Sequence, residues 1–125
     1  MKKIIVSKNT PAPIGPYSHA VKAGNTLYVS GQIGLNAKTG ELAGPDIKSE
    51  ARQVMENIRA ILAEAGADFS QVVKCSIFLM DMNNFTAVNE VYGSYFSSEF
   101  PARETVQVSG LPKNVNVEIS VIAVI

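Results

Sequence analysis

Two stretches near the end of the chain decide its fold: residues 100–108 read FPARETVQV and residues 111–119 read LPKNVNVEI. We interpret them as two β-strands joined by a connection at Gly110-Leu111-Pro112. The second strand is apolar at every odd-numbered position from 115 to 125, and its opposite face carries Glu118. Because a buried carboxylate without a partner is costly, Glu118 needs either a partner or a function.

Arg103, on the first strand, is the candidate partner. It shares a face with Thr105, as Glu118 shares one with Asn116 and Ser120. A salt bridge between the two strands is one interpretation, and a site for a small anion is the other. In the second interpretation the planar guanidinium binds a carboxylate through two hydrogen bonds, and the glutamate holds or deprotonates a water molecule beside it.

The chain before these strands alternates between strand and helix patterns, with Gly and Pro marking the loops. The expected order is β-β-β-α-β-α-β-β, an α+β fold with a mixed six-stranded sheet and two helices on one face. The two connections through helices predict parallel strand pairs, and Ala23-Gly24-Asn25 predicts a hairpin. Strands are expected at residues 4–6, 17–21, 26–31, 71–80 and in the two stretches above, and helices at 47–65 and from about 83 to before 101.

The helix signals are strong for the first helix, where Asp46 can cap the start and Gly66 can end it. Apolar residues recur between them at spacings of three and four, which is typical of one buried helix face. The residues of the second helix that we expect to point inward are Phe85, Val88, Tyr92, Tyr95 and Phe96, with Asn89 as a polar interruption among them.

The strand at 71–80 has apolar residues on both of its faces. Its inward residues are expected to be Val73, Cys75, Ile77 and Leu79. Phe78 and Met80, together with Ile122 and Val124 of the last strand, fall on the face turned away from the helices. No third helix remains to cover that face, so we expect the protein to associate with copies of itself.

The composition argues against several classes of protein. Lys plus Arg equal Asp plus Glu at 11 each, so nothing favours a nucleic acid or a membrane surface as partner. One histidine and one cysteine do not make a zinc or iron site, and we expect neither metal nor cofactor. His19 is expected at the surface and Cys75 as a buried structural thiol. The lone cysteine and the short apolar run at 4–6 favour the cytoplasm.

Five motifs, taken in order, resemble the RidA (YjgF) family of reactive-intermediate imine deaminases. The resemblance covers essentially the whole chain, so we expect one RidA-like domain over residues 1–125. The motifs are Ile14-Gly15-Pro16-Tyr17-Ser18, Ser30-Gly31-Gln32-Ile33, Asn57-Ile58, Val88-Asn89 with Tyr92, and the final pair Pro101-Ala102-Arg103 and Val117-Glu118-Ile119.

The resemblance implies a chorismate-mutase-like (RidA-like) fold, assembled as a homotrimer with sites in the clefts between subunits. In the family, the arginine of Pro-Ala-Arg binds the substrate carboxylate and the late glutamate positions the hydrolytic water. These roles fall on Arg103 and Glu118. The other residues implied to line the pocket are Tyr17, Ser30, Gly31, Asn89 and Thr105. Thr105 stands where many members have a cysteine, so a backbone contact remains but a thiol role does not. Glu104 is expected to point away from Arg103.

The implied activity is hydrolysis of short 2-imino or 2-enamino acids, such as 2-iminobutanoate and 2-iminopropanoate, to 2-oxo acids and ammonia. Such an enzyme protects pyridoxal phosphate enzymes from reactive enamines. The alternative is a non-catalytic module that binds or senses 2-oxo acids through the same arginine. A ribonuclease activity has been attached to relatives, but the neutral charge and the single histidine argue against it. A chaperone-like holdase would rest only on the apolar second face.

Overall fold

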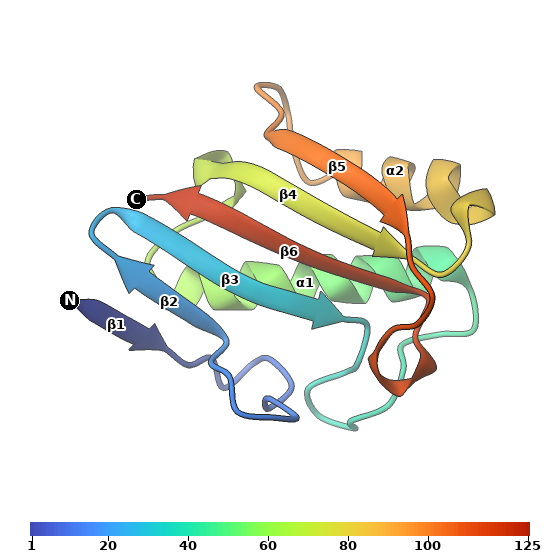
Figure 1. Cartoon of the computed structure of the whole chain (residues 1–125), viewed down its shortest axis with the longest axis horizontal. Helices are drawn as coiled ribbons and strands as arrows, with labels where there is room; N and C mark the ends of the chain where they lie inside the picture. The colour runs from blue at the N-terminus through green and yellow to red at the C-terminus, as the bar shows by residue number, and fades with distance from the viewer.

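The computed structural model describes residues 1–125 and contains six strands and two α-helices, with the open face of the sheet turned to the viewer in Figure 1. The strands are β1 (Lys2–Ile5), β2 (Ala20–Ala23), β3 (Thr26–Ile33), β4 (Val72–Leu79), β5 (Ala102–Gln107) and β6 (Val117–Val124). The helices are α1 (Ile47–Glu64) and α2 (Phe85–Gly93), with short 3-10 turns at Phe69–Gln71, Met82–Asn84 and Pro112–Asn114. The predicted element order is therefore confirmed.

The sheet runs in the order β1-β2-β3-β6-β4-β5. Every neighbouring pair is antiparallel except β4 and β5, which are parallel. The prediction of a mixed sheet is confirmed, but the prediction of two parallel pairs is wrong for the first connection. There, α1 leads from β3 to β4, and β6 occupies the place between those strands.

Helix α1 begins and ends where its sequence predicts. The Asp46 side chain accepts a hydrogen bond from the Ser49 backbone N–H at 3.2 Å, which satisfies one of the free donors of the first turn. Beyond the last turn, Gly66 adopts a φ of +76°, a left-handed conformation that glycine reaches without a steric penalty.

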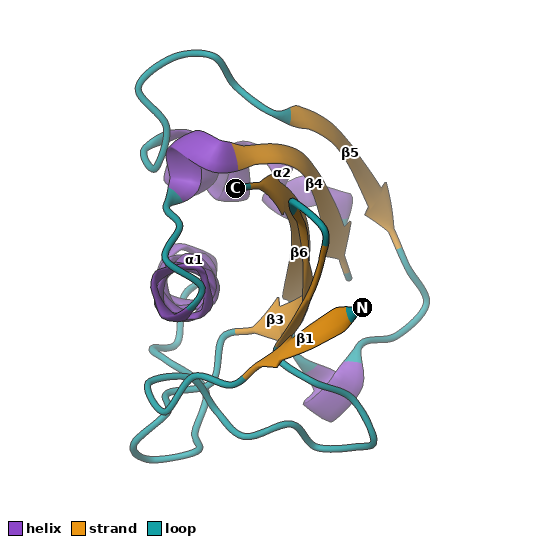
Figure 2. Cartoon of the chain, turned by 90° about the vertical axis from the view of Figure 1, so that its left-hand side faces the viewer, coloured by secondary structure: helices purple, strands orange, loops and turns teal.

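Both helices pack on the same face of the sheet, as the turned view in Figure 2 shows. A single apolar core of 22 buried residues fills the space between them. The α1 residues buried in this core are Ala51, Val54, Met55, Ile58, Ile61 and Leu62. They follow the predicted spacing of three and four, so burial of this apolar stripe fixes α1 against the sheet. No helix is both long enough and apolar enough to cross a membrane.

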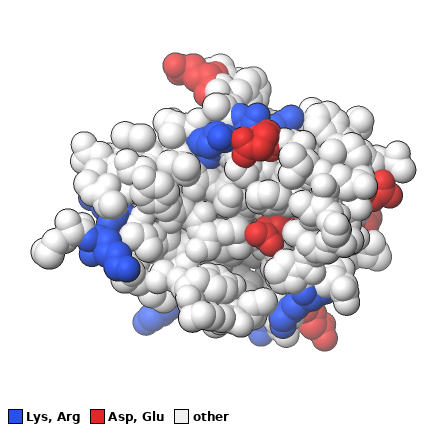
Figure 3. All heavy atoms as spheres, in the orientation of Figure 1, with Lys and Arg blue, Asp and Glu red and all other residues white.

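The other face of the sheet has no helix over it. Tyr28 and Val124 remain 50% and 48% exposed there, and Phe78 and Ile122 are only partly buried. Figure 3 shows this face turned to the viewer: it is mostly uncharged, with one acidic group near its middle and the other charged side chains toward its edges. The apolar second face is therefore present as the sequence predicts.

Local boundaries differ from the prediction in several places. β1 spans Lys2–Ile5 where 4–6 was expected, and α2 ends at Gly93, well before Pro101. β2 begins at Ala20, so Tyr17 lies in the proline-rich loop before the strand. β3 continues to Ile33 through a bulge between Val29 and Gln32. In β4 an irregularity between Val72 and Lys74 turns Val73 outward, and Val72 takes the buried position instead.

Candidate functional site

The two strands that carry Arg103 and Glu118 are not neighbours, because β4 lies between β5 and β6. Arg103 pairs in register with Cys75 of β4, whereas Glu118 pairs with Phe78. Cys75 and Phe78 are three residues apart on one strand, so their side chains point to opposite faces. Arg103 therefore faces the helices and Glu118 faces the open side. This arrangement rules out the interpretation of these residues as a salt bridge between strands.

Arg103 lies beside one stripe of α2, formed by Phe85, Asn89 and Tyr92. Their spacing of four and three places these residues on the same side of the helix. The Arg103 Nη1 donates a hydrogen bond to the Asn89 Oδ1, and the Arg103 Cζ lies 5.6 Å from the Phe85 ring centroid and 5.0 Å from that of Tyr92. Asn89 and Phe85 were predicted to point into the core, but both are exposed because α2 lies at the sheet edge.

A hollow of about 310 Å³ opens beside the Arg103 guanidinium. Its lining residues are Asn89, Tyr92, Gly93, Phe100, Pro101 and Arg103. None of these except Arg103 carries a charge, and the three salt bridges of the molecule join other residues. The hollow therefore presents a guanidinium whose remaining N–H groups are available to an anion.

Three uncharged groups lie on the buried side of Arg103: the Cys75 thiol, the Tyr92 hydroxyl and the Thr105 hydroxyl. Burial raises the pKa of the Cys75 thiol and that of the Tyr92 hydroxyl, which face each other. The Tyr92 hydroxyl and the Thr105 Oγ1 are buried and have no hydrogen-bond partner. Cys75 is the buried thiol that the sequence predicts, and its raised pKa keeps it in the unreactive protonated form.

Glu118 lies in a second hollow of about 310 Å³ on the open face. The residues around it are Ile14, Tyr17, Ser30, Gly31, Ile33, Pro112 and Glu118. The Tyr17 hydroxyl accepts a hydrogen bond from the Ile14 backbone N–H at 3.2 Å, which fixes the ring over the loop. The Ser30 Oγ donates to the Ser18 carbonyl at 2.6 Å. Tyr17, Ser30, Gly31 and Glu118 thus gather here, apart from Arg103 and Asn89.

Gly31 makes room for the Glu118 side chain. A Cβ on Gly31 would lie 2.8 Å from the Glu118 Cδ and closer still to a carboxylate oxygen, a contact that real Cβ atoms do not make. The carboxylate is half-buried, has no salt-bridge partner, and burial alone raises its pKa. A carboxylate with a raised pKa is a better proton acceptor than an ordinary glutamate, so Glu118 has the properties of a general base.

Two buried polar residues near this hollow had no predicted role: Glu50 was not singled out in the sequence, and Asn57 appeared only as part of a motif. The Glu50 carboxylate is buried and accepts hydrogen bonds from the backbone N–H groups of Asn116 and Val117 at 2.7 and 3.2 Å. The Asn57 Nδ2 donates to the carbonyls of Ile33 and Leu35, both at 3.0 Å. Glu50 and Asn57 interrupt the apolar stripe of α1, which was the available signal. They anchor the start of β6 and the end of β3.

The predicted position of His19 is wrong, whereas the predicted orientation of Glu104 is confirmed. His19 was expected at the surface but is 2% exposed. Its Nδ1 accepts from the Ser7 backbone N–H at 3.0 Å, and its Nε2 lies 2.8 Å from the Pro11 carbonyl. Both ring nitrogens therefore hold the loop before β2 together. Glu104 points away from Arg103, as predicted, and forms a salt bridge with Lys74 at 3.0 Å.

The geometry of the two hollows indicates the kind of ligand that each can take. One hollow offers a cation to a small anion and the other offers a basic carboxylate beside a hydroxyl and apolar walls. No group of three or more His, Cys, Asp or Glu side chains could hold a metal ion. The fold is thus an α+β domain with two separate hollows, each of a size and chemistry suited to part of a small polar molecule.

Residues 7–125 match the family model described as Endoribonuclease L-PSP. The chain belongs to this family, the RidA/YjgF family that its motifs resemble. It is 50% identical to a 2-iminobutanoate/2-iminopropanoate deaminase of Dermatophagoides farinae, over 99% of this chain and 97% of the relative.

Two solved structures share the fold. The Rid family protein YyfA of Yersinia pestis is 48% identical with a TM-score of 0.97, covering 100% of both chains. The TdcF protein of E. coli with bound serine is 40% identical with a TM-score of 0.94, covering 98% of both chains. The predicted RidA-like fold is therefore confirmed.

Proposed function

We propose that this protein is a hydrolytic deaminase that converts short 2-imino or 2-enamino acids, such as 2-iminobutanoate and 2-iminopropanoate, to 2-oxo acids and ammonia. The observation that carries the proposal is the pair of complementary hollows, with an unpaired guanidinium in one and a carboxylate of raised pKa in the other. The relative named for this reaction and the TdcF structure with bound serine support it, because serine carries the same carboxylate next to a nitrogen-bearing carbon.

In the proposed reaction, Arg103 binds the substrate carboxylate through its free N–H groups, and the Thr105 backbone contacts the same end of the substrate. Tyr17 and its apolar neighbours hold the methyl or ethyl tail beside Ser30 and Gly31. Glu118 takes a proton from water as the water oxygen bonds to the imine carbon. Starting from the protonated imine, this addition gives a carbinolamine. Its nitrogen takes back the proton held by Glu118 and leaves as ammonia, and the hydroxyl group loses its proton to the Glu118 carboxylate as C=O forms. Holding these groups together lowers the barrier by proximity.

The two half-sites meet only if more than one copy of the chain is present, since the sheet separates Arg103 from Glu118. We propose a homotrimer in which the open face of one copy, with its Glu118 hollow, is covered by the Arg103 edge of the next. Such an arrangement also buries the apolar surface around Tyr28 and Val124. A single domain over residues 1–125, a cytoplasmic location and a role in protecting pyridoxal phosphate enzymes stay predictions.

The description of the family as endoribonucleases does not lead us to propose that activity. The only histidine, His19, has both ring nitrogens engaged with backbone groups, so it is not available for acid–base chemistry on RNA. The face that carries Glu118 is nearly uncharged, whereas binding of a polyanion requires clustered Lys and Arg.

The test generates 2-iminobutanoate in situ with a threonine dehydratase, traps it with semicarbazide and follows semicarbazone formation. The wild-type protein is expected to suppress trapping, whereas Arg103→Ala and Glu118→Gln should not. Mixing these two variants by co-expression should recover about a quarter of the wild-type activity, because about a quarter of composite sites then contain both intact halves.

Each other outcome has a defined meaning. Recovery of no activity on mixing would contradict the composite site. Absence of suppression by the wild type, combined with thermal stabilisation by 2-oxobutanoate that depends on Arg103, would identify the non-catalytic carboxylate sensor instead. If the wild type neither suppresses trapping nor is stabilised by 2-oxobutanoate, the proposal of a small-carboxylate site at Arg103 is wrong.

A further inference from the structure

The Arg103 guanidinium has an unusual environment for a charged group. It has no carboxylate partner and is contacted by two aromatic rings, at 5.6 Å from Phe85 and 5.0 Å from Tyr92. Both rings and the Asn89 amide that accepts from Nη1 come from one face of α2. A cation over an aromatic face is attracted by the ring quadrupole without being neutralised. Phe85, Asn89 and Tyr92, which we call the guanidinium holder, therefore orient the Arg103 guanidinium and leave its charge available to a ligand.

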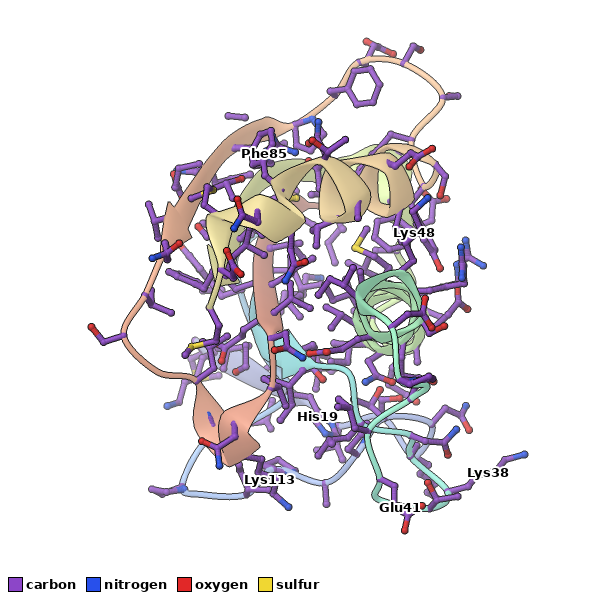
Figure 4. The ribbon with its side chains drawn as sticks, turned by 90° about the vertical axis from the view of Figure 1, so that its right-hand side faces the viewer. His19, Lys38, Glu41, Lys48, Phe85 and Lys113 are labelled. Carbon is purple, nitrogen blue, oxygen red and sulfur yellow. The ribbon has the colours of Figure 1, made fainter.

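Phe85 differs from Asn89 and Tyr92, the other residues of the guanidinium holder, because it does not line the hollow beside Arg103. It stands at the start of α2, on the side of the helix next to β5, as Figure 4 shows. It is 37% exposed, so it contributes little to the core. Its ring contacts the guanidinium, so Arg103 is the direct route by which Phe85 can affect a ligand in the hollow.

A second arginine provides an internal comparison. The Arg59 Cζ lies 5.8 Å from the Phe69 ring centroid and 5.1 Å from that of Tyr95, an arrangement close to that of Arg103. Arg59, however, also forms a salt bridge with Glu56 at 3.4 Å. Both arginines therefore contact two aromatic rings, but Arg59 is paired with a carboxylate and Arg103 is not. Only Arg103 is free to bind an anion.

We propose that Phe85 is a positioning residue for Arg103: together with Tyr92 it clamps the guanidinium between aromatic rings, so that its N–H edge is presented to the substrate carboxylate. The proposal rests on the proposed function for the identity of the ligand. It is an inference about orientation, because Phe85 itself touches neither the hollow nor any reacting atom. The clamp makes the guanidinium rigid before the carboxylate arrives, which lowers the entropy cost of binding.

The experiment uses the full-length protein labelled with ¹⁵N-arginine. The Arg103 Nε–Hε signal, assigned with Arg103→Lys, should be displaced by the ring currents. Phe85→Leu should move this signal toward that of an exposed arginine and speed its exchange with water. The same variant should weaken binding of 2-oxobutanoate, measured by titration calorimetry, about two- to five-fold. Phe85→Tyr, which keeps the ring, should restore both. Tyr95→Leu, which removes a ring from Arg59, should change neither.

An Arg103 signal that is identical in the wild type and in Phe85→Leu would overturn the proposal, as would a loss of affinity without a change in the signal. A different outcome would overturn the proposed function instead. In that case the Arg103 signal is displaced and depends on Phe85, but the protein neither binds 2-oxobutanoate nor suppresses semicarbazone formation. The aromatic clamp would then stand. The two failures are therefore distinguishable.

Discussion

The hollows around Arg103 and Glu118 have the same volume, about 310 Å³ each, but the chain completes them to different degrees. Arg103 is held on its own chain by an amide oxygen and two aromatic rings of α2. Glu118 lies on a face that no element of the chain covers, over the backbone of Gly31. The cationic hollow is organised by contacts within the chain, whereas the acidic hollow lies on a face that the chain leaves open.

The separation of the two charges has a chemical consequence. If β5 and β6 were neighbours in a register that placed Arg103 and Glu118 on one face, the two charges would pair, and neither would be available to a substrate. Insertion of β4 between them keeps the guanidinium unpaired and the carboxylate pKa raised within one chain. We infer that the strand order preserves both reactive groups until two copies and a substrate come together.

The largest expected effect is the loss of the base at Glu118. Glu118→Gln keeps the shape of the side chain but cannot take a proton from water, so kcat should fall on the order of 10²- to 10⁴-fold. The KM should change little, because the carboxylate of the substrate binds at Arg103. Steady-state kinetics in the semicarbazide assay measure both constants. A rise in KM with an unchanged kcat would show that Glu118 binds the substrate and does not activate water.

Arg103→Lys should have the next largest effect, and it should change KM more than kcat. Lysine keeps the charge but loses the planar fork and its bidentate geometry, so KM should rise about 10- to 100-fold, with a smaller change in kcat. Arg59→Lys is the matched control, since Arg59 also lies against two rings but is paired with Glu56. An equal effect of the two substitutions would mean that general destabilisation, and not anion binding, explains the result.

The smallest effect concerns stability. Burial raises the pKa of Glu118 above its ordinary value of 4.5, so this group favours the folded state when protonated, and that contribution is lost as the pH rises through the raised pKa. Glu118→Gln should therefore increase the melting temperature at pH 7 relative to the wild type, and the difference should vanish below the ordinary pKa. Thermal unfolding followed by circular dichroism at both pH values measures it.

Glu90→Gln provides a control of opposite sign for this last prediction. The salt bridge with Lys48 lowers the pKa of Glu90, so its contribution to stability is present at neutral pH and is lost as the pH falls. Its substitution should lower the melting temperature at pH 7 or leave it unchanged. A lower melting temperature for Glu118→Gln at pH 7 would indicate that the folded protein makes favourable contacts to this carboxylate.

Much of the architecture was predictable because it depends on local patterns. The cap at Asp46, the left-handed Gly66 and the apolar stripe between them specify α1 without reference to the rest of the chain. The alternation in β6 likewise predicts that Glu118 and the apolar odd-numbered residues face opposite ways. The motifs identified the family and gathered the candidate residues, since each motif is a short run that can be compared directly.

Other features depend on which strands become neighbours, and no local pattern contains that information. Alternation gives the face of Arg103 relative to Thr105, but only the insertion of β4 puts Arg103 and Glu118 on opposite sides of the sheet. For the same reason, Glu50 was missed, because the backbone N–H groups that it accepts from are 66 and 67 residues away. The sequence by itself determined the order of the elements and the family, and it supplied the candidate residues of the site. The tertiary structure alone decided that these candidate residues lie in two separate hollows on opposite faces, because hydrogen bonding between distant strands sets the order of the sheet.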